Sequence, residues 1–234
     1  MKPHDTWEVL PHGDLEKLAD NLYIVEGKLP MPLGDSIRHM TIVRLAGNRL
    51  AIFSAIALDE ARMAKLEALG TPAFLIVPSG IHRIDAKPWR DRYPQLQVIA
   101  PEHACARISH VVDVDTTDAD LGDPNAELFY VPGTDRRELA MIVHTSTGKT
   151  LVLNDLIFNM PAIDGWRGWP FKLMGFGFGH PSMPKLVMRK LVANDNDVRD
   201  QLRRWAHEGF ERIIVSHGKP IENPREALLE LAAA

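Results

Sequence analysis

The feature that most limits the fold of this chain is a plan of strands and helices that occurs twice. Each half opens with strands joined by short turns and closes with segments of helical period, which is typical of a hairpin sheet extended by helical crossovers. In the first half, strands are predicted at residues 21–27, 39–45 and 49–55, and helices at 59–69 and 102–108. Such a half-chain predicts a sheet with helices on one face.

The second half repeats this order. Its strands are predicted at residues 127–131, 139–144 and 149–153, and a helix at 197–208 precedes a further strand at 212–216. Two halves built in this way each leave one apolar sheet face to be covered by the other. The pattern therefore predicts an α/β fold in which two sheets pack face to face and the helices lie outside.

Length and composition predict a single domain over residues 1–234, because a chain of this size with 45% hydrophobic residues can bury one full core. Cys105 is the only cysteine and no charged-then-apolar leader opens the sequence, so we expect a cytoplasmic location. The apolar stretches are shorter than the roughly 20 residues that a membrane-spanning helix needs, which argues against a membrane partner. The 27 basic and 31 acidic residues are spread along the chain, which argues against a nucleic-acid partner.

A Gly/Pro-rich segment at residues 159–184 is too broken for a regular element and too aromatic for a disordered one, so we predict a loop insertion there. Two interpretations remain open. Trp166, Trp169 and Phe171 would wall a substrate pocket, or the same side chains would seal a core edge or a homodimer interface.

Three segments carry polar residues directly after predicted strands. They are Ile-Val-Pro-Ser-Gly-Ile-His-Arg-Ile-Asp at 76–85, Val-Pro-Gly-Thr at 131–134 leading to Leu-Asn-Asp at 153–155, and Val-Ser-His-Gly at 215–218. Their order resembles the metallo-β-lactamase superfamily across nearly the whole chain. In that family the segments are a strand followed by His-x-His-x-Asp-His, a Pro-Gly-His followed by a hairpin and a bridging Asp, and a strand-ending His. The shortened first motif, with Tyr-Pro at 93–94, is most similar to the group described as DUF4336.

The resemblance implies a four-layer αββα sandwich with two mixed sheets, and it also shows where the family's ligands are missing. If His82 stands on the second histidine of the first motif, Gly80 stands on the first and Asp85 on the last. Thr134 then takes the place of the Pro-Gly-His histidine and lines the substrate pocket. A register shifted by one residue would instead put Asp85 on the family's Asp and leave His82 outside the ligand positions.

The metal chemistry implied by this alignment is reduced to at most one ion, because only His82 remains of the three histidines that hold the family's first metal. Asp85, Asp155 and His217 would form a set of two carboxylates and one imidazole, which suits Zn²⁺, Mn²⁺ or Fe²⁺. His82 would then be the catalytic residue that holds substrate or transfers a proton. In the simpler alternative, the Asp155 carboxylate caps the next helix and His217 forms a hydrogen bond with a neighbouring carbonyl.

Three functions fit these observations. The first is a hydrolase with at most one metal ion that acts on a small ester, amide, lactone or phosphoester. The second is a metal-free, non-catalytic relative that binds a small molecule or a protein partner in the same cleft, which Gly80 and Thr134 favour. The third is a structural homodimer subunit with the aromatic segment buried between chains.

Overall fold

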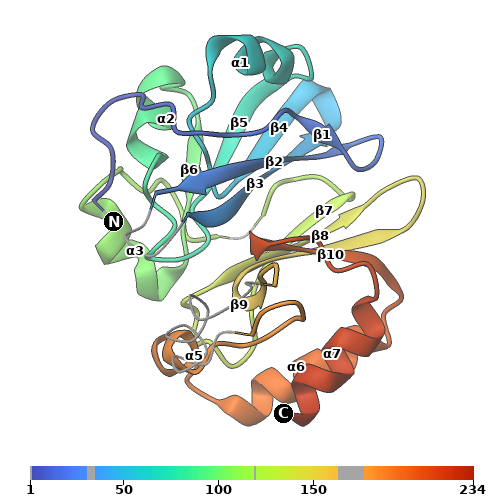
Figure 1. Cartoon of the computed structure of the whole chain (residues 1–234). Coiled ribbons are helices and arrows are strands. Elements are labelled where there is room, and N and C mark those ends of the chain that lie inside the picture. Colours follow the sequence, from blue (N-terminus) through green and yellow to red (C-terminus); the bar gives the residue numbers. More distant parts are fainter. Residues whose placement is uncertain (1, 31–34, 119, 163–176) are drawn as a thin grey trace.

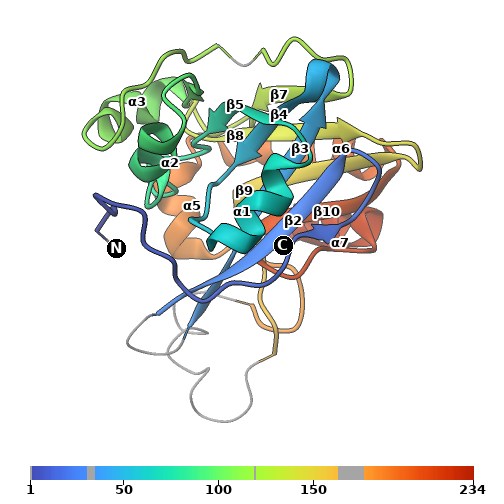
Figure 2. The ribbon, with the colours of Figure 1, turned by 90° about the horizontal axis from the view of Figure 1, so that it is seen from above.

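The computed structural model describes residues 2–30, 35–118, 120–162 and 177–234, and they form two sheets packed face to face. Figure 1 shows the first sheet above and the second below, with helices covering the outer face of each. Figure 2 shows, from above, helices of the first half lying across the sheets. The predicted αββα sandwich with two mixed sheets is confirmed.

The first sheet has six strands whose spatial order follows the chain: β1 (Glu16–Lys17), β2 (Leu22–Leu29), β3 (Ser36–Leu45), β4 (Arg49–Phe53), β5 (Thr71–Ile76) and β6 (Gln97–Ile99). The pairs from β1 to β4 are antiparallel, whereas β4, β5 and β6 are parallel neighbours. A short 3₁₀ turn (Ala46–Asn48) joins β3 to β4 with φ values of 71° at Gly47 and 58° at Asn48. Those positive φ values are the reason that Gly and Asn occupy the turn.

The second sheet has four strands in the order β10 (Phe210–Gly218), β9 (Lys149–Asn159), β8 (Leu139–His144) and β7 (Ala126–Tyr130). The outer pair of β10 and β9 is parallel, and the other two pairs are antiparallel. Strand β9 runs well beyond residue 153, where the sequence pattern predicted its end. That extension carries part of the candidate site.

Six α-helices occur in the described ranges: α1 (Glu60–Glu67), α2 (Ala86–Arg92), α3 (Glu102–Ser109), α5 (Lys185–Leu191), α6 (Asp195–Ala206) and α7 (Pro224–Ala233). The Asp59 side chain caps α1 by accepting a hydrogen bond from the backbone N–H of Arg62, and the Asn194 side chain caps α6 by accepting from those of Asn196 and Asp197. Helix α5 was not predicted from the sequence, and it has only seven residues. No helix in these ranges is both long and apolar enough to cross a membrane.

The core consists of three apolar layers. One lies between the first sheet and its helices around Trp89, one between the second sheet and its helices around Trp205, and one between the two sheets. Both tryptophan side chains are almost fully buried. Truncation of a buried tryptophan to Ala typically costs roughly 3–5 kcal/mol of stability. The three layers therefore hold the two sheets and their helices together.

Candidate metal centre

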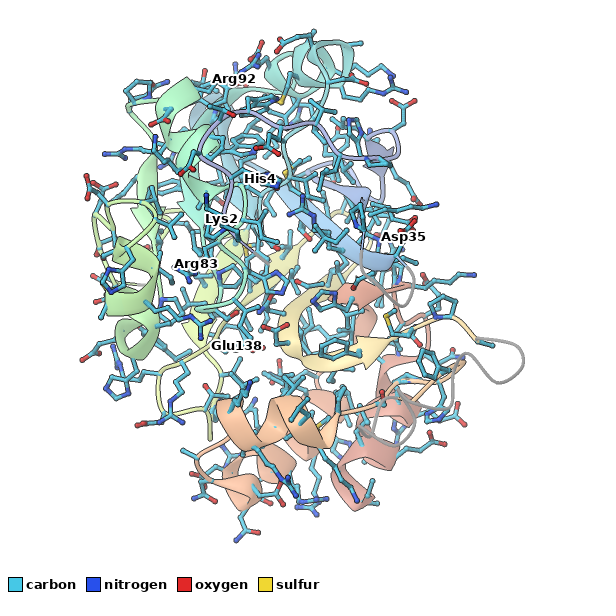
Figure 3. All side chains as sticks on the ribbon, turned by 60° about the vertical axis from the view of Figure 1, so that its left-hand side comes forward. Lys2, His4, Asp35, Arg83, Arg92 and Glu138 are labelled. Atoms are coloured by element: carbon cyan, nitrogen blue, oxygen red, sulfur yellow. The ribbon has the colours of Figure 1, made fainter. Side chains whose placement is uncertain are left out.

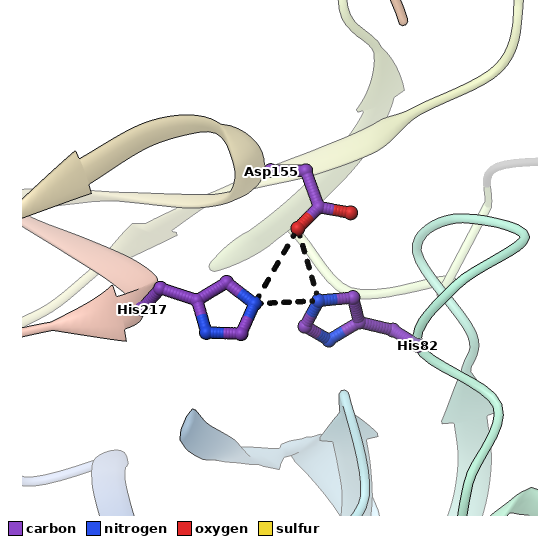
Figure 4. Close-up of side chains that lie close together, drawn as sticks. All are labelled: His82, Asp155 and His217. Atoms are coloured by element: carbon purple, nitrogen blue, oxygen red, sulfur yellow. Dashed lines mark hydrogen bonds and ion pairs between the residues drawn. The ribbon is translucent and has the colours of Figure 1, made fainter. Parts of the chain in front are cut away.

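Three separate elements bring His82, Asp155 and His217 together (Figure 4). His82 lies in the loop between β5 and α2, Asp155 lies within β9, and His217 lies near the end of β10. Asp155 is buried and the two imidazoles are partly buried. In the part of the chain that the structure describes, this is the one group of three His, Cys, Asp or Glu side chains close enough to share a metal ion.

The ligand-type atoms face one another at short range. His82 Nε2 lies 3.1 Å from Asp155 Oδ1 and 3.2 Å from His217 Nε2, and the remaining distance, His217 Nε2 to Asp155 Oδ1, is 3.5 Å. Two imidazole nitrogens at 3.2 Å form a hydrogen bond only if one carries the hydrogen and the other accepts it. The three atoms thus converge on one small volume.

A wide bulge in β9 presents Asp155 to this volume. Val215 pairs with Leu153 and His217 pairs with Phe158, so two steps along β10 match five steps along β9. The extra residues of β9 interrupt its regular pairing with β10, and Asp155 lies among them. Such a bulge leaves backbone N–H groups without a partner in the sheet. These groups need other acceptors, because an unpaired buried donor costs free energy.

Glu138 supplies those partners. Its buried carboxylate accepts hydrogen bonds from the backbone N–H of Asp155 at 3.2 Å and of Leu156 at 3.1 Å. Burial raises the pKa of Glu138 well above its usual range, and the negative charge of Asp155 adds to that effect. Nothing in the local sequence pattern signals this role, because Glu138 comes directly before β8 and contacts β9 only in the folded chain.

The outer atoms of the three side chains are held by neighbours. Asp155 Oδ2 accepts hydrogen bonds from Ser79 Oγ and from Asn154 Nδ2, both at 2.9 Å. Asn154 is itself held by Ser216, whose Oγ donates to Asn154 Oδ1 at 2.8 Å. Asp155 Oδ1 is therefore the oxygen that remains directed at the two imidazoles.

The two imidazoles are oriented in the same way. His217 Nδ1 donates to the carbonyl oxygen of Ile37 at 2.8 Å, and the ring stacks on Phe158 with centroids 4.8 Å apart. His82 Nδ1 lies 2.8 Å from Ser54 Oγ, and Ser54 holds an uncommon φ of 57°. Neighbours that bind one ring nitrogen and direct the other inward are typical of metal-binding histidines.

The charge at the site follows from these contacts. Burial alone would raise the pKa of Asp155, but the adjacent imidazoles of His82 and His217 outweigh it and hold that pKa well below its usual range. Asp155 is accordingly a carboxylate at neutral pH. A set of one carboxylate and two imidazole nitrogens has the chemistry of a site for Zn²⁺, Mn²⁺ or Fe²⁺.

The structure brings together Asp155, His217 and His82, but it places Asp85 elsewhere. Asp85 Oδ2 pairs with the Arg38 guanidinium at 2.6 Å and Oδ1 lies 2.8 Å from His4 Nδ1, so its carboxylate is already engaged. The expected set of two carboxylates and one imidazole is thus replaced by His82, Asp155 and His217. The physical reason is the buried Arg38, which needs a counter-charge and takes the one at Asp85.

The residues predicted to line a substrate pocket have different placements. Thr134 is fully buried and its Oγ1 donates to the carbonyl oxygen of Val131 at 2.7 Å, so it closes its own turn instead of lining a pocket. Trp166, Trp169 and Phe171 lie outside the described residues, and the insertion over 159–184 stays a prediction.

The fold is that of the metallo-β-lactamases, whose solved structures superpose on almost the whole chain. The DIM-1 metallo-β-lactamase matches with a TM-score of 0.65 at 12% identity, covering 97% of this chain and 99% of its own. TMB-1 matches with a TM-score of 0.63 at 13% identity, covering 94% and 96%. The FIM-1 enzyme from Pseudomonas aeruginosa, in its mono-zinc form, matches with a TM-score of 0.62 at 12% identity, covering 96% of each chain.

Comparison of sequences adds no closer relationship. No family model matches the chain, and no curated protein matches it. At these identities the structural matches show the metallo-β-lactamase fold and not a shared activity. The narrower grouping with the DUF4336 proteins stays a prediction.

Proposed function

We propose that this chain binds one divalent metal ion through His82, Asp155 and His217 and hydrolyses a small ester, amide, lactone or phosphoester. The observation that carries the proposal is the convergence of two Nε2 atoms and one carboxylate oxygen whose outer atoms are all engaged by neighbours. Catalytic zinc sites commonly use three protein ligands and keep a further position open. An ion bound there supplies Lewis acidity, which polarises a carbonyl or phosphoryl oxygen and lowers the pKa of water.

The chain's own residues would prepare this site in a definite way. Ile37 keeps the hydrogen of His217 on Nδ1, so Nε2 presents a lone pair inward. The Ser54 hydroxyl can accept from His82 Nδ1, which would free His82 Nε2 in the same manner. Ser79 and Asn154 bind the outer oxygen of Asp155 and so direct the inner one.

A second candidate is a metal-free relative that binds a small molecule or a protein partner. The observation that favours it is that His82 Nε2 can donate to Asp155 Oδ1 at 3.1 Å, which satisfies both groups without an ion. Gly80 and Thr134, which stand where the resemblance places two further histidines, agree with it. The two candidates differ in whether the purified protein contains metal.

Elemental analysis by mass spectrometry of protein purified without chelator separates them. We expect near-stoichiometric metal in the natural chain, loss of that metal in Asp155→Ala and His217→Ala, and retention in His103→Ala, a control histidine outside the group. Absence of metal after reconstitution with Zn²⁺, Mn²⁺ and Fe²⁺ would establish the metal-free alternative. With metal present, turnover of ester, lactone and phosphoester substrates is measured on the same preparations.

A further inference from the structure

A cavity of about 250 Å³ opens directly beside Asp155. The loop Ser79–Ile81 forms one wall, and residues of α3 and α5 form the others. Figure 3 shows this side of the molecule, with Arg83 and Glu138 labelled between the helices of the two halves. Because a candidate ligand is part of its wall, a molecule in this cavity would lie next to the proposed metal centre.

Gly80 decides what fills the space over this loop. A Cβ atom built on Gly80 would lie 3.1 Å from Arg107 Cδ and 3.8 Å from Arg107 Cγ. The aliphatic part of the Arg107 side chain therefore packs against the backbone of Gly80. A side chain at position 80 would occupy the same space. At the position where the resemblance places the family's first histidine, this chain offers space for an arginine instead.

Basic side chains predominate around the cavity. Arg107, Arg137 and Lys190 line it, and Arg137 shares the carboxylate of Asp135 with His103 at 3.1 and 3.2 Å. No carboxylate within the described ranges forms an ion pair with Arg107 or Lys190. Two cations at the cavity thus lack a protein counter-charge in this part of the chain.

A further cation lies next to Arg107. The Arg83 guanidinium donates a hydrogen bond to the backbone carbonyl of Arg107 at 2.7 Å. The local field is therefore positive, as expected of a surface that attracts anions.

Apolar side chains occupy the rest of the wall. Ile81 is 54% exposed and Leu186 is 45% exposed, and both belong to the four most exposed large hydrophobic residues in the described ranges. Val187 and Leu191 continue the apolar surface from α5. Apolar side chains left open to solvent beside convergent charges are typical of a ligand site.

We infer that this pocket binds an amphipathic organic anion, with a carboxylate or phosphate group held by Arg107 and Lys190 and a short apolar body against Ile81 and Leu186. This inference rests on the proposed function in one respect: the bound anion is the substrate only if the chain is a hydrolase. The hydrolysed molecule would then be an anion bound beside Asp155. The volume lies just below the range of about 300–1,000 Å³ for drug-sized ligands, which favours a small molecule.

Calorimetric titration with defined probes tests this pocket in both chelator-treated and zinc-loaded protein. Octanoate and octyl phosphate present an anion with an apolar body, octanamide presents the body alone, and inorganic phosphate presents an anion alone. We expect one or both amphipathic anions to bind at least roughly tenfold more tightly than octanamide and inorganic phosphate, the scale of one charged hydrogen bond. The better of the two head groups identifies the carboxylate or the phosphate class.

Variants locate the binding site. Arg107→Gln and Lys190→Gln should each weaken binding of the anion by roughly tenfold, because each removes one charged partner. Lys185→Gln, on the exposed side of the same helix as Lys190 and outside the cavity lining, should leave binding unchanged. The inference would be overturned if neither octanoate nor octyl phosphate bound more tightly than octanamide, or if all three substitutions had equal effects.

The chelator-treated sample keeps this result separate from the metal proposal. Loss of anion preference in protein that still takes up zinc would overturn the pocket and leave the metal centre standing. Anion binding that depends on Arg107 in protein that takes up no metal would support the pocket and overturn the hydrolase proposal.

Discussion

The Nδ1 atom of His217, at the end of β10, lies 2.8 Å from the carbonyl oxygen of Ile37 on β3 in the opposite sheet. Two residues back along β10, the carbonyl oxygen of Val215 accepts from Nδ1 of His39 at 3.1 Å. Since a carbonyl oxygen can only accept, both Nδ1 atoms carry hydrogen. The packing of the two sheets thus determines which nitrogen of His217 faces the candidate site.

The buried imidazole of His39 makes stability depend on pH. Burial lowers the pKa of His39 below its ordinary value of 6.5. Below about pH 6.5 the unfolded chain therefore binds a proton that the folded chain resists, so stability falls with decreasing pH by at most about 1.4 kcal/mol per pH unit.

This dependence is measured by urea unfolding between pH 7.5 and 5.0. We expect His39→Gln to have a shallower slope than the natural chain, and the exposed His110→Gln to keep the natural slope. Identical slopes in all three proteins would show that groups other than His39 cause the loss of stability at acidic pH.

Removing the carboxylate of Glu138 should destabilise the bulge that carries Asp155. Glu138→Ala leaves the backbone N–H groups of Asp155 and Leu156 without their acceptor, at a cost of about 1–3 kcal/mol for each. Glu138→Gln keeps one acceptor oxygen and should lose less. The free energy of unfolding and the zinc affinity are expected to fall in the same order, from Gln to Ala.

The matched control for this series is Glu127→Gln, an exposed carboxylate on the neighbouring strand β7. It should change neither quantity. A Glu138→Ala protein that loses stability but binds zinc as tightly as the natural chain would limit Glu138 to a role in folding.

Loss of the Asp85 carboxylate should affect folding and not metal content. Asp85→Asn leaves the buried Arg38 guanidinium without its counter-charge, which typically costs about 3–5 kcal/mol. Replacing both partners, as Arg38→Met with Asp85→Leu, should recover much of that loss, because buried pairs often exchange for apolar residues at little cost. Chemical denaturation and metal content are measured for both proteins at low temperature, and a folded Asp85→Asn protein devoid of metal would restore Asp85 as a ligand.

Ser79 offers a test of whether the surroundings of Asp155 are adapted to a metal. Ser79→Ala removes the hydrogen bond from Oγ to Asp155 Oδ2, and loss of such a contact typically weakens metal affinity by about 10–100-fold. The fold should be unaffected, as in the control Ser109→Ala on α3. Competition with a zinc chelator measures the affinity, and equal values for the two variants would speak against a tuned site.

Much of the fold could be predicted because its signals are local. Gly47 and Asn48 mark a turn that only positive φ values allow, and the apolar runs on either side of it predict β3 and β4. The continuation of β9 past residue 153 gave no such signal. Leu156, Ile157 and Phe158 are as apolar as a strand or a buried loop requires, so the bulge between them and Leu153 was invisible in the pattern.

The site was predictable only in part, because side-chain partners depend on distant residues. Asp155 and His217 follow the strand ends that the pattern predicted at residues 153 and 216, and both join the group. The sequence of the loop that contains both His82 and Asp85 does not indicate which of them joins Asp155 and His217. This is determined by Arg38 and His4, which lie 47 and 81 residues away in the chain and bind Asp85.

His82 follows a strand of the first sheet, whereas Asp155 and His217 belong to the second. An ion held by all three would therefore be a reversible cross-link between the two halves of the molecule, closed by metal and opened by a chelator. Unfolding of either half would require the ion to dissociate first. Metal binding would therefore increase the protection of both sheets from hydrogen exchange together. The stability of the folded protein would then depend on the concentration of available metal, even when no substrate is present.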